Sequence, residues 1–160
     1  MKALLLAGLL AMALCCTTSS GMCTGKEDTA FTSIKITVRN NIRLVRSFLQ
    51  YFDNATNERW DTLGNNFLVK FNIKNKQARA LFSNNGRLIY SILFGTEKDL
   101  PTELRYRVRS AYFDYHITRS IEVQENRRTI WIVEMADHDK RLTVRVEDNE
   151  MEEVQRYIDN

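Results

Sequence analysis

The chain of 160 residues is poor in the residue types on which recognisable catalytic motifs depend. It contains only two histidines and six glycines. Glycine is too sparse for a phosphate-cradling loop, and neither a P-loop nor a dinucleotide-binding fingerprint occurs. No Gly-x-Ser-x-Gly elbow is present, and nucleophilic catalysis needs a nucleophile beside a base that a third group orients. We therefore predict that the protein is not an enzyme and uses no cofactor.

Cysteine is absent from all but the start of the chain. The three cysteines are Cys15, Cys16 and Cys23, so the folded part has no disulfide framework and no thiolate metal cluster. About 130 residues remain after the N-terminal segment, and they must form a hydrophobic core that is stable without cross-links. One domain is the expectation for a chain of this length.

Dense runs of one charge are also missing. Basic residues exceed acidic ones by three, and the charges are interspersed along the chain. No Lys/Arg block of the kind that marks nucleic-acid binding appears, so we expect no nucleic-acid partner. No apolar run after the N-terminal one approaches membrane-spanning length, so no transmembrane segment is expected.

The N-terminus carries the pattern of a secretory signal. Lys2 supplies a positive charge, the apolar run Ala3–Leu14 follows, and small or polar residues continue to Gly21. The apolar run is too short to span a bilayer. We predict a signal peptide at 1–21, a linker at 22–30 and a domain at 31–160, in a protein exported to the periplasm or the cell surface.

Two routes of processing are open for this leader. Cys15 and Cys16 lie where a lipoprotein cysteine would lie, although Leu14 is larger than the residue usually found before an acylated cysteine. Ordinary cleavage near Ser20 or Gly21 is the competing route and would give a soluble protein. Lipid anchoring would instead tether the domain to a membrane, such as the outer membrane.

Hydrophobic periodicity predicts an α+β domain. Apolar residues recur at helical spacing in two segments, and alternate with polar ones in several others. Asn40 is the expected N-cap of the first helix, Pro101 the first residue of the second, and Asn84-Asn85-Gly86 a tight turn. The C-terminal segment Glu150–Tyr157 is either a strand or a short helix. The expected strands are 34–38, 67–73, 78–82, 88–94, 117–123, 129–135 and 141–146.

The two halves of the chain resemble each other at an offset of 61 to 64 residues. Val45-Arg46-Ser47 matches Val108-Arg109-Ser110, and the strand at 67–71 falls over the strand at 131–135. A steady offset across helix and strand indicates duplication of one unit. The predicted fold is tandem αβββ units with helices packed on antiparallel sheet, at about 34–98 and 99–158.

Several of these segments are similar to motifs of the β-lactamase-inhibitor-like (BLIP-like), PepSY-like proteins that Bacteroidetes export. The segment from Phe52 to Trp60 resembles the F-x-N-A-[ST]-x-x-x-W signature, and Tyr112 to Thr118 resembles Y-x-x-Y-x-I-T. The hairpin at 80–88 also fits, and the resemblance extends over about 34–146. It implies a periplasmic or surface-exposed domain of unknown function, and no inhibitory activity is carried over with it.

Candidate functional residues are few. Trp60, Tyr115 and Trp131 are the aromatic residues that we consider for a binding surface, although most aromatic side chains in such a domain fill the core. The turn Asp137-His138-Asp139 could offer two carboxylates and an imidazole to a metal, but turn geometry favours the same residues. His116 is expected to be an ordinary strand residue.

Two tripeptides resemble the O-glycosylation site of exported Bacteroidetes proteins, with Thr29 and Thr62 as the acceptors. Such tripeptides are common by chance, and an intact mass without added sugar would remove the hypothesis.

These observations predict a non-catalytic module that binds an unknown protein or peptide of the cell envelope. An inhibitor of an extracytoplasmic hydrolase is a narrower alternative. A metal-binding protein that uses the Asp137-His138-Asp139 turn is another, and a structural envelope protein cannot be separated from the first by sequence.

Overall fold

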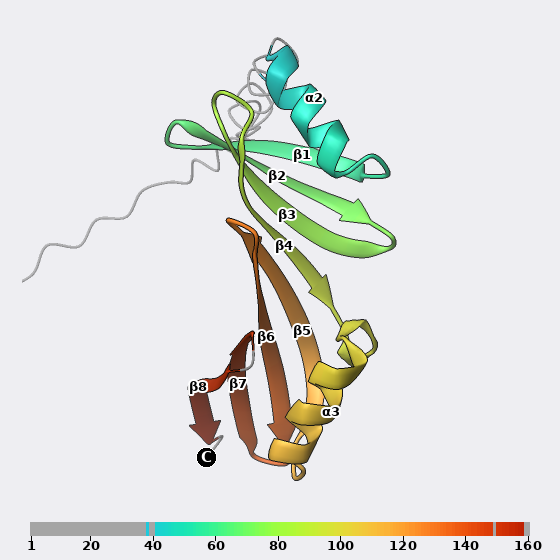
Figure 1. Cartoon of the computed structure of the whole chain (residues 1–160), viewed down its shortest axis with the longest axis vertical. Coiled ribbons are helices and arrows are strands. Elements are labelled where there is room, and N and C mark those ends of the chain that lie inside the picture. The colour runs from blue at the N-terminus through green and yellow to red at the C-terminus, as the bar shows by residue number, and fades with distance from the viewer. Residues whose placement is uncertain (1–37, 39–40, 149, 159–160) are drawn as a thin grey trace, which may run out of the picture.

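The computed structural model describes residue 38 and residues 41–148 and 150–158. They form one eight-stranded antiparallel sheet with two helices (Figure 1). The strands lie in the sheet in the order of the sequence, each paired with the next. The elements are α2 (Ile42–Tyr51), β1 (Thr56–Leu63), β2 (Asn66–Ile73), β3 (Lys76–Ser83), β4 (Leu88–Gly95), η1 (Glu97–Asp99), α3 (Thr102–Ala111), β5 (His116–Glu125), β6 (Arg128–Asp137), β7 (Lys140–Glu147) and β8 (Glu150–Ile158).

The expected α+β class, with helices packed on antiparallel sheet, is confirmed. Each unit nevertheless contains four strands and not three. The additional strand of the first unit is β1, where only Trp60 is buried and the alternation that reveals a strand is missing. The additional strand of the second unit is β8, which settles the open choice for the C-terminal segment.

Helix α2 forms because two large apolar residues lie one turn apart. Leu44 and Phe48 are fully buried against the sheet. The N-cap is Asn41 and not the expected Asn40, because the Asn41 side chain accepts a hydrogen bond from the backbone N–H of Leu44 at 3.2 Å. The predicted strand at 34–38 lies outside the described residues except for Val38, which is helical.

Helix α3 repeats this arrangement with smaller residues. Leu104 and Val108 are its buried residues, and Pro101 is its N-cap rather than its first residue. The buried positions of the two helices therefore correspond at an offset of sixty residues, so that Val108 takes the place of Phe48. The alignment of Val45 with Val108, which relied on residue identity, was wrong because Val45 is only half-buried. The strand alignment holds, since Val69 and Val133 are both fully buried.

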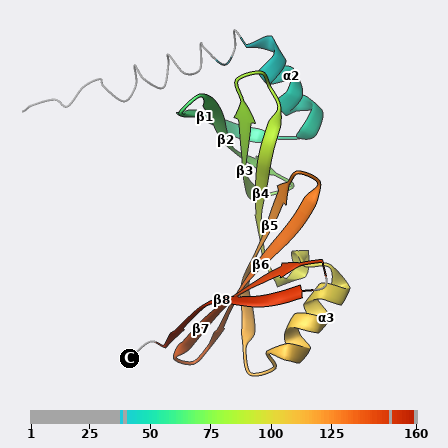
Figure 2. The ribbon, with the colours of Figure 1, turned by 60° about the vertical axis from the view of Figure 1, so that its left-hand side comes forward.

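Each helix covers a separate core on the same face of the sheet. The first core lies between α2 and β1–β3 and is rich in aromatic rings, with Phe48 against Trp60, Phe71 and Phe82. The second lies between α3 and β5–β7 and is mostly aliphatic, including Val133, Leu142 and Val144. Strands β4 and β5 join the two units, and Figure 2 shows the twist of the sheet along its length.

Candidate functional site

The face of the sheet opposite α2 and α3, called here the open face, is covered by neither helix. Directly paired residues project to the same face, and residues two apart along a strand do so as well. The registers therefore place Ser91 and Gln124 on the helix side, and Ile92 and Val123 on the open face. The same reasoning follows from β1 to β8, so the open face is continuous across both units.

An apolar stripe crosses the centre of the open face from β3 to β6. Cross-strand pairing brings its members together, for example Phe94 opposite Ile121 and Ile121 opposite Ile132. All of them except buried Leu81 are half-buried, because each shields its neighbours. The apolar stripe consists of Leu81, Tyr90, Ile92, Phe94, Ile121, Val123, Ile130 and Ile132.

A row of three basic residues continues the open face beyond the stripe. Arg59 pairs with Lys70, and Lys70 pairs with Arg79, so three cationic side chains stand on three adjacent strands. Lys70 makes an ion pair with Asp61 at 2.9 Å, with both side chains nearly half exposed. Within residues 41–148 and 150–158, neither Arg59 nor Arg79 has a carboxylate partner. The guanidinium of Arg79 instead lies 5.2 Å from the centre of the Phe94 ring.

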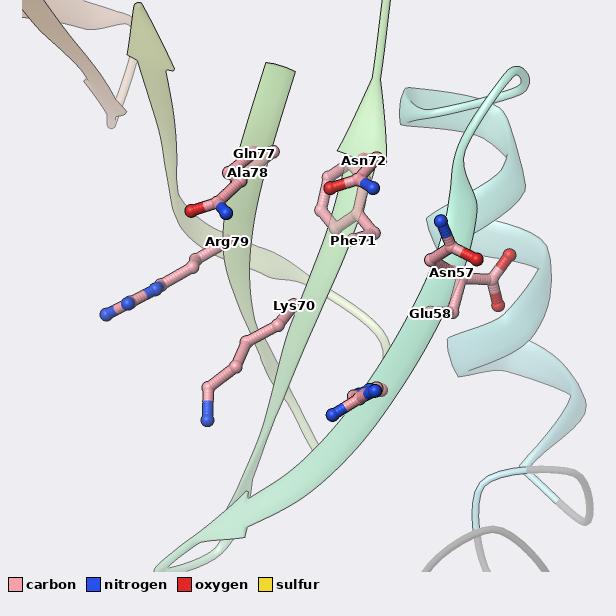
Figure 3. A pocket seen from close by; sticks show the side chains of 9 residues that line it. Asn57, Glu58, Lys70, Phe71, Asn72, Gln77, Ala78 and Arg79 are labelled. Carbon is pink, nitrogen blue, oxygen red and sulfur yellow. The ribbon is translucent and has the colours of Figure 1, made fainter. Parts of the chain in front are cut away.

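This basic row borders a shallow depression of about 660 Å³. The side chains of Lys70 and Arg79 extend from neighbouring strands away from α2, and Gln77 lies beside them (Figure 3). Asn72 and Gln77 add amide groups that can donate and accept hydrogen bonds. Glu58 is the one carboxylate among the lining residues, so the lining carries a positive excess.

The charges of the second unit are arranged differently. Glu147 of β7 makes ion pairs with Arg128 of β6 and with Arg145 of its own strand. Arg145 also lies 3.6 Å from Glu152 of β8. This end of the open face is therefore internally neutralised, while the end at β1–β3 is not.

The fold has known counterparts among solved structures. A DUF2874 family protein of Bacteroides uniformis superposes with a TM-score of 0.57 at 12% identity, over 73% of this chain and 88% of that one. A BLIP-like protein of Bacteroides fragilis gives the same TM-score and identity, over 70% and 84%. A predicted periplasmic protein of Bacteroides eggerthii gives 0.57 at 10% identity, over 73% and 87%.

The fold is BLIP-like. This confirms the BLIP-like part of the resemblance drawn from the sequence, while none of these structures is described as PepSY-like. At such low identity the likeness concerns the fold alone. No family model and no curated protein matches the chain.

The three aromatic residues considered for a binding surface do not come together. Trp60 is 8% exposed and belongs to the first core, so its ring is not a surface group. Trp131 packs against the second core on the helix side and lines a smaller depression beside α3. The two tryptophans of the BLIP-like sheet therefore lie on its covered face, and the aromatic residues of the apolar stripe on the open face are Tyr90 and Phe94.

Tyr115 lies at the far end of the second core. Its hydroxyl accepts a 3.5 Å hydrogen bond from Arg156 of β8, and Arg156 pairs with Glu153. The Glu153 carboxylate raises the pKa of the Arg156 guanidinium. Burial, together with Glu153, raises the pKa of Tyr112. This cluster ties the edge strand β8 to the end of α3.

Both histidines lie at the same end of the sheet, since His116 pairs with Ala136 of β6, one residue before the Asp137-His138-Asp139 turn. The Asp137-His138-Asp139 turn joins β6 to β7, and the His138 side chain is 94% exposed. Among the described residues, no group of three or more His, Cys, Asp or Glu side chains is placed to hold a metal ion. His116 begins β5 and is exposed.

The remaining predicted positions fall at or beyond the edge of the described structure. Thr62 is exposed in the edge strand β1, whereas Thr29, Cys15, Cys16 and the predicted leader lie outside the described residues. No helix in the described part of the chain combines the length and the apolar character that crossing a membrane requires.

Sequence reasoning missed Arg59, Lys70 and Arg79. The three residues lie 9 to 20 positions apart in sequence, and only the strand registers bring them together. The pairing of Lys70 with Arg79 could have been predicted from the sequence. The two residues occupy polar positions of two alternating strands that are joined by a two-residue turn. Strand β1 was not expected, so Arg59 could not have been added.

Proposed function

We propose that this chain is a non-catalytic binding module of the bacterial envelope that recognises a protein partner through the open face of its sheet. The observation that carries the proposal is the apolar stripe on a face that neither helix covers. Contiguous apolar surface on a folded protein is characteristic of interaction sites. The stripe runs over four strands, which at a strand spacing of about 4.8 Å is a width of roughly 14 Å.

The shape of this face favours a macromolecule over a small metabolite. Small-molecule sites are concave and enclose most of the ligand. The open face is broad, and the depression beside it is shallow and bordered by long polar side chains. An apolar centre with a charged margin is the usual anatomy of a protein–protein interface.

An envelope location accords with the secretory pattern of the N-terminal sequence and with the BLIP-like fold. Binding without catalysis accords with the exposure of His116 and His138, since both imidazoles lie open to solvent.

Site-specific photo-crosslinking tests the proposal. A benzoylphenylalanine replaces Tyr90 or Phe94 on the open face, and as matched controls replaces Tyr106 or Phe113, which are 73% and 81% exposed. All four exchanges keep an aromatic ring at the position and add the same benzoyl group. In cells that make the protein naturally, we expect a discrete protein adduct from positions 90 and 94 and none from 106 and 113. Equal labelling at all four positions, or adducts at the controls alone, contradicts the proposal.

A narrower second candidate is inhibition of an extracytoplasmic hydrolase, which the BLIP-like fold favours. The open face would then cover the entrance of the enzyme's active site. Assays with envelope proteases and β-lactamases decide this candidate, since absence of inhibition at high micromolar concentration removes each enzyme tested.

A further inference from the structure

The geometry points to an acidic segment of the partner protein, carrying at least two carboxylates beside apolar side chains, as the ligand of the basic row Arg59–Lys70–Arg79. This inference rests on the proposed function, because it names the chemistry of the partner that the open face binds. Three observations support it: the register of β1–β3, the lack of an ion-pair partner for Arg59 and Arg79 among the described residues, and the apolar and amide side chains beside the row.

The basic row places like charges directly opposite one another. Arg59 stands opposite Lys70, and Lys70 opposite Arg79. Like charges in such cross-strand pairs are destabilising, so the free protein bears a cost that an anionic ligand relieves. Asp61 neutralises the charge of Lys70 but not that of Arg59 or Arg79, and both side chains of the Asp61–Lys70 ion pair are exposed to water.

In the second unit, the charges on the open face of β6–β8 are neutralised within the protein. There Glu147 and Glu152 are interleaved with Arg128 and Arg145 on adjacent strands. In the first unit, Arg59 and Arg79 are both exposed, and neither forms an ion pair with a carboxylate of the described residues. The two units therefore differ in charge on the open face, and the two arginines of the basic row are left to pair with an anion from outside the protein.

Two arginines favour carboxylates in particular. The guanidinium group is planar and forms paired hydrogen bonds with a carboxylate. Carboxylates two residues apart on an extended segment are separated by about 6.6 Å, which the long side chains of neighbouring strands can bridge. Arg79 is already held over the Phe94 ring at 5.2 Å, which limits the freedom that it loses on binding.

The surroundings of the basic row favour a protein segment over a free anion. Ile92 pairs with Arg79 across β3 and β4, so the apolar stripe begins beside the row. Asn72 and Gln77 offer amides suited to a peptide backbone. A segment that alternates acidic and apolar residues satisfies the cations, the amides and the stripe together, whereas inorganic phosphate satisfies the cations only.

Fluorescence anisotropy with a defined probe tests the inference. The probe is an eight-residue peptide of alternating Glu and Val with blocked termini, and the comparison peptide has Gln for every Glu. The variant Arg59→Gln/Arg79→Gln removes two charges from the basic row. The control Arg46→Gln/Arg127→Gln removes two exposed charges elsewhere, from α2 and from the β5–β6 turn.

We expect the acidic peptide to bind the unaltered protein at least tenfold more tightly than the Gln peptide. The Arg59→Gln/Arg79→Gln variant should lose at least tenfold in affinity for the acidic peptide, and the control variant less than threefold. Equal losses in the two variants, or no preference for the acidic peptide, overturn the inference. Full displacement of the peptide by an equal concentration of inorganic phosphate also overturns it, because the site would then be one for free anions.

Crosslinking at Phe94 in the Arg59→Gln/Arg79→Gln background separates this inference from the proposed function. Loss of the adduct supports the acidic segment, and an undiminished adduct overturns it while leaving the open face as the binding surface. Absence of an adduct in the protein with both arginines counts against the proposed function itself.

Discussion

A single carboxylate, Asp99, organises the connection between the two units. It forms an ion pair with Lys76 of β3 at 2.5 Å and accepts a 2.8 Å hydrogen bond from the backbone N–H of Thr96. The hydrogen bond from Lys76 is the chief reason why the pKa of Asp99 is lowered from 3.8 to about 2, and the Thr96 backbone is the next. Gly95 belongs to the same junction, since a Cβ there would meet the Asp99 carboxylate at 2.9 Å.

The substitution Asp99→Asn should therefore destabilise the fold in a pH-dependent way. A carboxylate whose folded pKa lies below its unfolded value stabilises the protein above the unfolded pKa and stops doing so as pH falls through the folded one. We expect a loss of about 1–2 kcal/mol at pH 7, reduced for the partial exposure of the pair, which shrinks below pH 4 and vanishes near pH 2. Urea unfolding of both proteins at pH 7, 4, 3 and 2 measures this difference.

The matched control for Asp99 is Asp61→Asn, which breaks the exposed pair with Lys70. An exposed ion pair of this kind contributes less than about 1 kcal/mol. A penalty for Asp99→Asn that is as large at pH 2 as at pH 7 would show that its carboxylate charge is not what stabilises the junction.

At the scale of elements, the turn between β3 and β4 closes a hairpin and also holds the N-terminal end of α2 in place. The Asn41 side chain donates a 2.9 Å hydrogen bond to the Asn84 carbonyl while it caps α2. Gly86 has a φ of +85°, and a Cβ there would meet the Arg43 carbonyl oxygen at 3.0 Å. The helix and the turn are therefore in contact through backbone atoms, which cannot shift to accept a larger residue without distorting the helix or the turn.

Gly86→Ala should accordingly destabilise the protein more than Gly64→Ala does. Both glycines have positive φ, which costs a residue with a Cβ about 1–2 kcal/mol. Gly64 has open space around it, whereas Gly86 is pressed against α2, so we expect an additional 1–2 kcal/mol at Gly86. Chemical denaturation of the two variants gives the comparison, and equal penalties would mean that the turn does not fasten the helix.

The elements with strong local patterns were predictable, and the edge strands were not. Strands β2 and β7 alternate buried residues with half-buried or exposed ones, and β3 does so as far as Leu81, which is buried on the open face; the sequence displays this pattern directly. Strand β1 buries only Trp60, and β8 buries none of its residues fully, so neither carries a period of two. The candidate site depends on long-range register, because the neighbours of Arg59 are fixed by pairing with β2 and not by anything local.

For the whole molecule, the division into two cores predicts unequal responses to damage. The first core has Phe48 at its centre, with ring centroids 5.2 Å from both Trp60 and Phe71. The second core shares no residue with it, and polar Ser91 and Gln124 lie between them on the helix side. The units are therefore coupled through the pairing of β4 with β5, through the apolar stripe on the open face and through the Asp99–Lys76 ion pair.

Phe48→Ala should unfold the first unit before the second. Removal of a buried phenylalanine costs about 3–5 kcal/mol, and here the loss falls on one core only. Trp60 reports the first core and Trp131 the second, so single-tryptophan forms with Trp131→Phe or Trp60→Phe separate the two signals. In guanidinium titrations, we expect Phe48→Ala to lower the midpoint seen by Trp60 more than the midpoint seen by Trp131. Coincident midpoints in the variant would show that the contacts between the units couple them by more than about 3–5 kcal/mol, and that the sheet unfolds as one cooperative body.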